Sequence, residues 1–163
     1  MTYQIDTMKP EDWPQVAEIY QEGIDTGIAT FVSEIPTWED WDQEHIEACR
    51  LVARQGDEIL GWTALIQTSD RDSYAGVAEL SIYVASKSKG IGVGTALLKA
   101  LIEASEEEGY WTLLAGILIE NEASQRLHLK CGFRTVGIRQ RLGRMADGSF
   151  HDVVFMERRS EKF

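Results

Sequence analysis

Three alternate glycines lie near the middle of the chain, in the segment Lys89-Gly90-Ile91-Gly92-Val93-Gly94-Thr95. The segment follows an apolar run and precedes a stretch with strong helical periodicity, so it lies between a predicted strand and a predicted helix. Glycine lets the backbone take a positive φ and approach a ligand closely, and the free N–H groups at a helix start bind anions. The segment therefore predicts a pyrophosphate site, because a purely flexible turn would not need alternate glycines.

Two other glycine-rich phosphate loops fit this segment less well. A Walker A loop ends in Gly-Lys-Ser/Thr, which is absent here. A dinucleotide fingerprint has the spacing Gly-x-Gly-x-x-Gly, opens its domain and carries an acidic residue about 20 positions later. Gly90, Gly92 and Gly94 instead alternate past the middle of the chain. A nucleotide-binding module that uses this loop stays open as an alternative.

Two titratable side chains suggest proton transfer. Glu79 lies in the otherwise apolar and small run Val77–Val84, where a buried carboxylate is costly unless it is paired or functional. Partial burial would raise the pKa of Glu79 toward that of a useful base; a solvent-facing strand position is the alternative. His128 lies on a short predicted helix, and its imidazole titrates near neutrality, which suits proton donation. A lone histidine on a helix is nevertheless more often structural.

The composition narrows the class of protein. The 163 residues are 44% hydrophobic and 26% charged, which is typical of one globular domain, predicted to span residues 1–163. A formal charge of −11 disfavours nucleic acid and anionic membranes as partners. The N-terminal sequence lacks a signal-peptide pattern, and no apolar run approaches the roughly 20 residues of a membrane span. With only Cys49 and Cys131, we expect a cytoplasmic protein with reduced thiols and no metal site.

Hydrophobic periodicity predicts the elements that must position these residues. Helices are predicted at Pro10–Glu22, from Thr37 onward, at Thr95–Glu108 and at Ala123–Cys131, and strands at Leu51–Arg54, Ile59–Ile66, Val77–Val84, Thr112–Ile119, Thr135–Arg141 and Asp152–Arg158. The nearly all-apolar run at 112–119 is typical of an interior strand. The order α-α-β-β-β-α-β-α-β-β predicts a mixed α/β domain with helices on both faces of one sheet.

The motif Lys89-x-x-Gly92-x-Gly94 resembles the Arg/Gln-x-x-Gly-x-Gly/Ala acetyl-CoA signature of the GNAT superfamily of N-acetyltransferases. The resemblance extends to Glu79–Val84, Asn121–Ser124 and Leu127–Phe133, in the order and spacing of the phosphinothricin and methionine sulfoximine acetyltransferase branch. It covers nearly the whole chain and implies a mostly antiparallel GNAT-type sheet with acetyl-CoA as the cofactor. Lys89 replaces the usual Arg or Gln, but its amine still suits phosphate.

The resemblance also implies roles for individual residues. Glu79 is implied to be the general base, directly or through water, and His128 the acid that protonates the departing CoA thiolate. A bulge and a splay of the 77–84 strand would free a backbone N–H for the thioester carbonyl. Asn121 would contact the pantetheine arm, although it also suits a helix cap. The implied cofactor-binding residues are Ile82, Tyr83, Val84, Lys89, Gly90, Ile91, Gly92, Val93, Gly94, Thr95, Asn121 and Lys130.

The acceptor is predicted to bind beside the loop that precedes the Glu79 strand. By resemblance, Asp72, Ser73 and Tyr74 occupy the segment that contacts the acceptor, and Arg71 is the nearby cation. A solvated surface loop is the alternative. In the fold that the resemblance implies, the first two helices line the acceptor side, so Trp38 and Trp41 of the second predicted helix would wall the acceptor pocket.

These features together predict an acetyl-CoA-dependent N-acetyltransferase that acts on the α-amino group of a small amino-acid-like acceptor. The resemblance favours acceptors of the phosphinothricin or methionine sulfoximine type and implies a homodimer. Nucleic acid and membranes are not expected as partners. Two alternatives stay open: an acetyltransferase for another amine, such as a polyamine, a protein N-terminus or a lysine, and a non-catalytic CoA-binding sensor.

Overall fold

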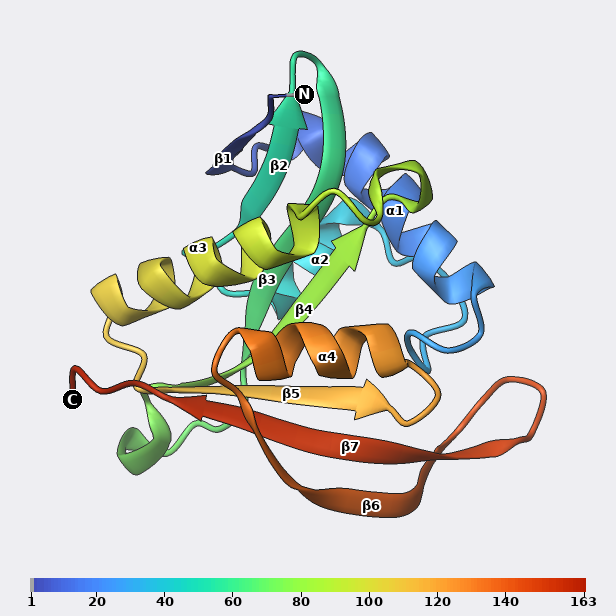
Figure 1. Ribbon diagram of the computed structural model, residues 1–163, viewed down its shortest axis with the longest axis vertical. Coiled ribbons are helices and arrows are strands. Elements are labelled where there is room, and N and C mark those ends of the chain that lie inside the picture. Colours follow the sequence, from blue (N-terminus) through green and yellow to red (C-terminus); the bar gives the residue numbers. More distant parts are fainter. Residues whose placement is uncertain (1) are drawn as a thin grey trace.

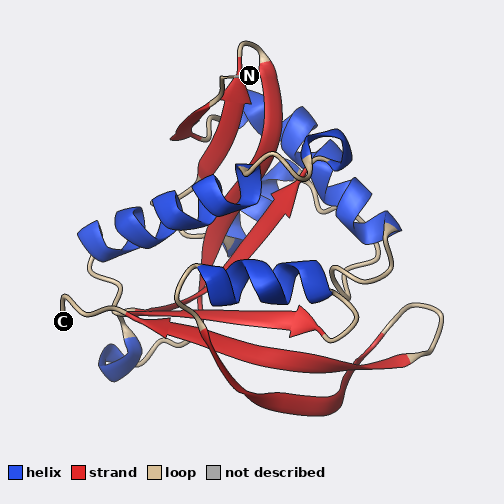
Figure 2. Ribbon diagram, in the orientation of Figure 1, coloured by secondary structure: helices blue, strands red, loops and turns tan. Residues whose placement is uncertain are grey.

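The computed structural model describes residues 2–163. Seven strands form one sheet in the order β1-β2-β3-β4-β5-β7-β6, with helices on both faces (Figure 1, Figure 2). The helices are α1 (Trp13–Asp25), α2 (Trp38–Glu44), α3 (Val93–Glu107) and α4 (Glu122–Lys130), with 3-10 turns at Pro10–Asp12, Asp72–Tyr74 and Ser86–Ser88. The strands are β1 (Gln4–Thr7), β2 (Leu51–Gln55), β3 (Glu58–Gln67), β4 (Val77–Val84), β5 (Thr112–Leu118), β6 (Arg134–Arg144) and β7 (Phe150–Arg159).

The predicted mixed α/β architecture is confirmed, with three corrections. Every neighbouring pair of strands is antiparallel except β4 and β5. The sequence prediction missed β1, whose four residues pair with β2 at the sheet edge and are too few for a periodicity signal. Helix α3 begins at Val93 rather than Thr95. The second predicted helix, whose apolar positions from Trp38 to Cys49 suggested a longer element, ends at Glu44, so Ala48 and Cys49 lie outside it.

Two apolar clusters hold the helices against opposite faces of the sheet. On one face, Val16 of α1 and Trp41 of α2 pack against Trp62 of β3. On the other face, Leu98 of α3 packs in a cluster that includes Leu80 of β4. Because side chains alternate along a strand, the neighbours of Leu80 on β4 point toward the α1 side of the sheet.

Strands β4 and β5 pair only over a short stretch and then diverge. Their parallel pairing runs from Val77 with Thr112 to Glu79 with Leu114, after which β5 pairs with β7 alone. The splay expected from the family resemblance is therefore present. The expected bulge is not found in β4, because β3 and β4 keep one register through Val84. Beyond Glu79, the β5-facing backbone edge of β4 is left without a strand partner among the described residues.

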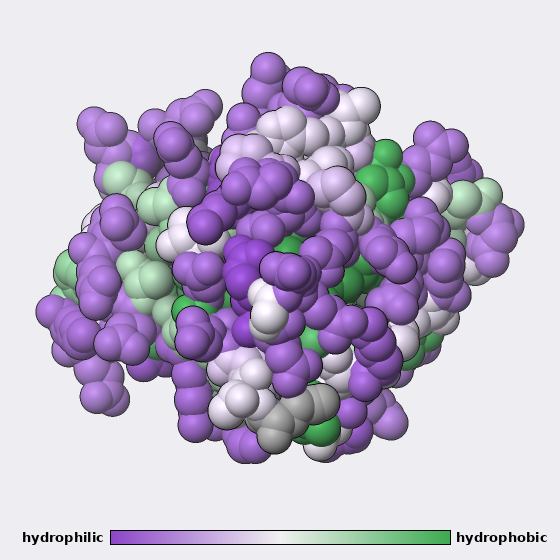
Figure 3. Space-filling model, turned by 90° about the horizontal axis from the view of Figure 1, so that it is seen from above, coloured by the Kyte–Doolittle hydropathy of each residue, from purple (hydrophilic) through white to green (hydrophobic). Residues whose placement is uncertain are grey.

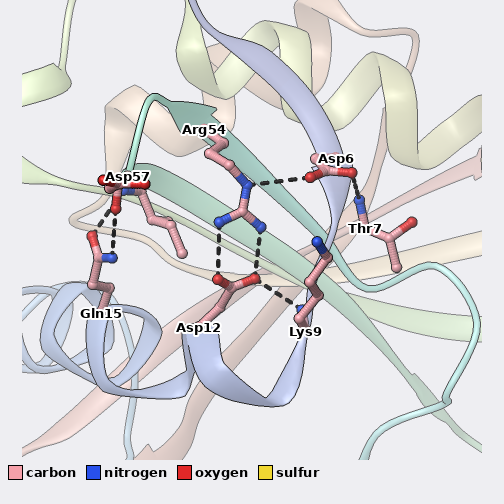
Figure 4. A network of polar contacts seen from close by, with 8 residues as sticks. Asp6, Thr7, Lys9, Asp12, Gln15, Arg54 and Asp57 are labelled. Carbon is pink, nitrogen blue, oxygen red and sulfur yellow. Dashed lines mark hydrogen bonds and ion pairs between the residues drawn. The ribbon is translucent and has the colours of Figure 1, made fainter.

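A buried ion pair joins the first two strands to the start of α1 (Figure 4). The Arg54 guanidinium donates to both carboxylate oxygens of Asp12, at 2.9 and 2.8 Å, and to Asp6 on β1 at 3.2 Å. The backbone N–H of Lys9 also donates to Asp12, at 2.9 Å. The Arg54 guanidinium holds the pKa of the Asp12 carboxyl below its usual value. These contacts fix where α1 begins relative to the edge of the sheet.

The chain carries a net charge of −11. On the face seen from above, hydrophilic side chains predominate, and apolar groups form smaller patches among and beside them (Figure 3). Within residues 2–163, no helix has both the length and the hydropathy that crossing a membrane requires.

Candidate active site

A cleft of about 890 Å³ opens where β4 and β5 part, a size typical of small-molecule sites. Its walls come from β4, the start of α3, β5, α4, the end of α1 with the segment that follows it, and part of the β6–β7 pair. Most of the predicted cofactor residues line it: Ile82, Tyr83, Val84, Lys89, Gly90, Gly92, Val93, Gly94, Thr95, Asn121 and Lys130. Ile91 does not, because its side chain points to solvent and is 44% exposed.

The start of α3 forms an anion site at one end of the cleft. Gly92 caps the helix with a φ of +88°, a conformation that L side chains rarely adopt. The first backbone hydrogen bond of the helix is donated by the Ala96 N–H to the Gly92 carbonyl oxygen, at 3.0 Å. The preceding first-turn N–H groups are thus available, and the helix dipole favours an anion there. With Lys89 and Lys130 lining the same cleft, these residues fit the phosphates of acetyl-CoA.

Glu79 lines the cleft from the last position at which β4 pairs with β5. The residue is exposed, so the solvent-facing alternative holds for Glu79 in the open cleft. Within residues 2–163 its carboxylate has no hydrogen-bond or ion-pair partner, and partial desolvation by the surrounding walls raises its pKa above the ordinary 4.5. Its Oε1 atom lies 3.8 Å from the position that a Cβ atom on Gly116 would take, so Gly116 keeps space open beside the carboxylate. An unpaired carboxylate with a raised pKa is suited to accept a proton from an amine.

His128 lines the cleft from α4 and is only 2% exposed. Its Nδ1 atom lies 2.7 Å from the Ser124 carbonyl, so Nδ1 carries the proton and donates it. The ring meets Phe133 edge-on, and Nε2 has no partner within residues 2–163. Burial lowers the pKa of the imidazole below 6.5, so the neutral ring with a bare Nε2 dominates at neutral pH.

Asn121 has a structural role in addition to its place in the cleft. Its Oδ1 accepts a hydrogen bond from the Ser124 backbone N–H at 3.2 Å and so caps α4. The cap occupies the amide oxygen, which leaves the amide NH₂ group to serve a ligand in the cleft. The prediction that Asn121 caps a helix is therefore confirmed.

Sequence reasoning missed the role of Gly23 in the wall that α1 contributes. Gly23 lies inside α1 rather than at its end, and a Cβ atom there would fall 2.7 Å from the ring of Tyr83. Tyr83 stacks on Trp62, with ring centroids 5.0 Å apart, and meets Tyr20 in a tilted arrangement at 4.9 Å. Gly23 therefore lets α1 approach the aromatic side of the cleft. A glycine inside a helical pattern was the available signal.

The predicted acceptor residues do not line the cleft of this chain. Arg71, Asp72, Ser73 and Tyr74 lie just before β4, at the end where it is still paired with β5, and are exposed. The expectation that this loop opens at the cleft is not met within one chain, because the cleft widens only beyond Glu79.

The predicted aromatic wall of the acceptor pocket is wrong. Trp41 has no exposed surface, and Trp38 packs beside it in the core between α1, α2 and β3. Neither ring reaches the cleft. The structure instead places Arg139 of β6 and Phe155 of β7 in the wall of the cleft. No sequence motif marks either residue.

The sequence predicts no metal site. Residues 2–163 contain no group of three or more His, Cys, Asp or Glu side chains that could hold a metal ion. Cys49 and Cys131 are buried free thiols, and burial raises the pKa of Cys49 to about 11, so it is not an activated nucleophile.

Comparison with known proteins identifies the family to which the chain belongs. The model of the acetyltransferase (GNAT) family matches residues 12–133. The chain is 33% identical to a phosphinothricin N-acetyltransferase of Streptomyces coelicolor over 156 residues, 91% of each chain. It is 28% identical to an L-methionine sulfoximine/L-methionine sulfone acetyltransferase of Pseudomonas aeruginosa, covering 90% of this chain and 88% of that one.

A solved structure agrees with the sequence relatives. The fold is similar to that of a GNAT superfamily phosphinothricin acetyltransferase from Sinorhizobium meliloti in complex with AcCoA, with a TM-score of 0.86 at 25% identity. The match covers 98% of this chain and 89% of that structure. The predicted fold and enzyme class are thereby confirmed, and the chain belongs to the GNAT family as an acetyl-CoA-dependent N-acetyltransferase.

Proposed function

We propose that this N-acetyltransferase acetylates the α-amino group of a small amino-acid-like acceptor, of the phosphinothricin or methionine sulfoximine type. The observation that carries the proposal is the unpaired Glu79 carboxylate at the point where β4 leaves β5, inside a cleft sized for small molecules. The names of the Streptomyces and Pseudomonas relatives support the acceptor class. The size of the cleft favours a small amine at Glu79 over the bulkier side chain or terminus of a protein acceptor.

Acetyl-CoA supplies the thioester whose carbonyl carbon the acceptor amine attacks. The N–H groups of Val93, Gly94 and Thr95, with Lys89 and Lys130, bind its phosphates. The Asn121 amide donates to the pantetheine arm. The free backbone edge of Ile82–Val84, exposed by the splay, holds the thioester carbonyl. These roles follow from groups that have free donors and line one cleft.

Glu79 makes the acceptor nucleophilic. An α-amino group is mostly protonated near neutral pH, and only its neutral form attacks a thioester. The Glu79 carboxylate takes the ammonium proton, directly or through water. Its raised pKa narrows the gap between base and amine, which makes this transfer more favourable than it would be to an ordinary glutamate.

His128 hands a proton to the departing thiolate. Since Nδ1 already donates to Ser124, the ring acts as an acid only after Nε2 takes up a proton. Burial lowers the pKa of the ring, so the imidazolium is scarce and gives up that proton readily. His128 is therefore not protonated at Nε2 in the resting enzyme; it takes up a proton there during the reaction and passes it to the sulfur.

The contact between Asp72–Tyr74 and the acceptor and the homodimer both stay predictions. Strand β6 is the edge of the sheet and exposes the apolar side chains Val136, Ile138 and Leu142. An unpaired apolar edge of this kind is a surface on which a second copy can pair. Light scattering in solution measures the mass directly: twice the chain mass supports the homodimer, and a single chain mass contradicts it.

An acceptor screen with acetyl-CoA and a thiol-release readout tests the proposed function. Phosphinothricin or methionine sulfoximine is expected to give a kcat/KM well above those of spermidine, lysine peptides and peptide N-termini. If spermidine or a peptide N-terminus exceeds every free amino-acid analogue, the acceptor class is wrong. Acetyl-CoA binding without turnover of any amine would instead support the sensor alternative.

A further inference from the structure

An unpaired, exposed arginine of β6 lines the cleft that also contains Glu79. The Cζ atom of Arg139 lies 4.2 Å from the ring centroid of Phe155, and both residues line the cleft. Within residues 2–163, Arg139 has no hydrogen bond or ion pair, whereas Arg50, Arg54 and Arg134 each meet a carboxylate. One face of the guanidinium is thus held on an aromatic ring, and its edge with the N–H groups stays free for a ligand.

Strand pairing places this guanidinium on the same face of the sheet as Glu79. Directly opposed residues of antiparallel strands share a face, which relates Arg139 to Val153 and Gly116 to Phe155. Val153 and Phe155 are two residues apart on β7, so all four positions share one face. On that face, a Cβ atom on Gly116 would lie 3.4 Å from Val153 and 3.8 Å from Glu79 Oε1.

The spacing of the two groups suits a small zwitterion. The Glu79 carboxylate lies beside Gly116 on β5, and the guanidinium lies over Phe155 on the adjacent β7. Neighbouring strands are about 5 Å apart. An α-amino acid carries its amine and its carboxylate on one carbon, so it suits a carboxylate and a guanidinium that lie over adjacent strands on one face of the sheet.

We propose that Arg139 binds the α-carboxylate of the acceptor while Glu79 receives the proton of its α-amine. The inference rests on the proposed amino-acid acceptor and adds the residue that selects for a free carboxylate. The planar guanidinium can give two parallel hydrogen bonds to a carboxylate, and Phe155 fixes its plane. Arg139 therefore takes the role that the sequence had suggested for Arg71, which lies outside the cleft.

The test compares Arg139→Gln with the wild-type enzyme on two matched acceptors, phosphinothricin and its α-carboxamide. The wild type is expected to prefer the free acid. Arg139→Gln should raise KM for the free acid about 10- to 100-fold, as expected for lost charge-assisted hydrogen bonds, and remove the preference over the amide. KM for acetyl-CoA should not change. Arg139→Lys should be intermediate, because it keeps the charge and loses the fork.

Arg141→Gln is the matched control. Arg141 lies on the same strand with its Cζ atom 4.9 Å from the Phe150 ring centroid, but it does not line the cleft. It should leave both KM values unchanged. Thermal melting of the variants checks that each is folded, and if Arg139→Gln does not fold, Arg139→Lys carries the comparison.

Three outcomes overturn the assignment of Arg139. Unchanged KM for the free acid in Arg139→Gln would remove the contact. An equal rise for the acid and the amide would assign the arginine to the phosphinate end of the acceptor. A rise in KM for acetyl-CoA alone would assign it to the cofactor. A wild-type enzyme that acetylates neither compound would instead contradict the proposed function itself, so the two failures are distinguishable.

Discussion

Burial shifts Glu79 and His128 in opposite directions for one reason. Taking a group out of water disfavours its charged form, which raises the pKa of the Glu79 carboxyl from 4.5 and lowers that of the His128 imidazole from 6.5. The same physical effect therefore makes the proposed base a better proton acceptor and the proposed acid a better proton donor.

Glu79→Gln removes the proposed base and nearly preserves the side-chain volume. The kcat/KM for the acceptor should fall roughly 10²- to 10⁴-fold. In the wild type, activity should fall as the pH drops through the folded-state pKa of Glu79, which lies above 4.5, because the protonated acid cannot accept a proton. A pH–rate profile of both proteins is the measurement, and the variant should lack this acid limb.

The deficit of Glu79→Gln should be largest at pH values above the pKa of Glu79 but below that of the acceptor amine, where the wild type has an ionised base and the amine is still protonated. It should shrink below the pKa of Glu79, where the wild type loses its base. Glu103→Gln, an exposed change on α3, is the control and should match the wild type. If Glu79→Gln keeps the parental pH profile, Glu79 is not the base.

At the scale of elements, the junction between β4 and α3 carries the proposed cofactor site. The strand ends at Val84, and the chain reaches the helix through two glycines with positive φ, Gly90 at +83° and Gly92 at +88°. Among the described residues, and apart from its chain neighbours, the nearest atom to a Cβ built on Gly92 is Tyr3 Oη, at an ordinary contact distance of 3.8 Å. Packing inside the protein therefore does not require glycine there, and the requirements that remain are the backbone conformation and the space for a ligand.

Gly92→Ala is expected to weaken acetyl-CoA binding by tenfold or more, or about 1.4 kcal/mol. The added methyl group strains the left-handed conformation and occupies the space where the backbone meets the phosphates. Gly109→Ala is the matched control: Gly109 has a φ of +94°, follows the other end of α3 and has open space around its Cβ position. Calorimetry of both folded variants decides, and Lys89→Ala should have a smaller effect. Equal affinities in the two alanine variants would refute the loop assignment.

The Arg54–Asp12 pair predicts a pH-dependent stability at the edge of the sheet. The pKa of Asp12 lies below its unfolded value of 3.8, so its stabilisation is complete above pH 3.8 and is lost as the pH falls through the folded value. Asp12→Asn should lower the free energy of unfolding by about 3 kcal/mol at neutral pH, because it leaves a largely buried guanidinium poorly paired. The deficit should shrink in acid.

Urea unfolding at several pH values measures the effect of Asp12→Asn. Asp6→Asn is the control, because Asp6 is the exposed partner of the same arginine, with 44% of its side chain accessible. That change should cost less than about 1 kcal/mol. A similar loss in both variants would mean that burial does not set the strength of the pair.

Elements with strong periodicity were predictable from the sequence, and the acceptor side of the site was not. Sequence patterns placed the 77–84 strand, the glycine junction and the cap at Asn121 correctly, because each depends on neighbours in the chain. The loop at 71–74 is close to Glu79 in sequence, but the cleft opens away from it, since β4 and β5 part only after Glu79. Arg139 reaches the cleft through the pairing of β6 with β7, which no local pattern encodes.

The charge of the whole molecule and that of the cleft differ in sign. The chain carries −11, yet the charged side chains that line the cleft are Lys89, Lys130 and Arg139 against Glu22 and Glu79. An anionic cofactor is therefore repelled at long range and attracted at contact. A zwitterionic acceptor is nearly indifferent to the long-range field, whereas a polyamine is attracted by it.

This contrast predicts how salt affects each substrate. Raising the ionic strength from about 0.01 to 0.1 M shortens the Debye length from about 30 to 10 Å, which screens the distant acidic surface and largely spares contacts inside the cleft. KM for acetyl-CoA should therefore fall as salt is added, and KM for an amino-acid acceptor should change little. For spermidine, any measurable KM should rise. Initial rates in NaCl, with sucrose of equal osmolality as the control, separate these cases. A KM for acetyl-CoA that rises steeply with salt would show that Lys89 and Lys130 outweigh the other charges, because only cations close to the phosphates produce that sign.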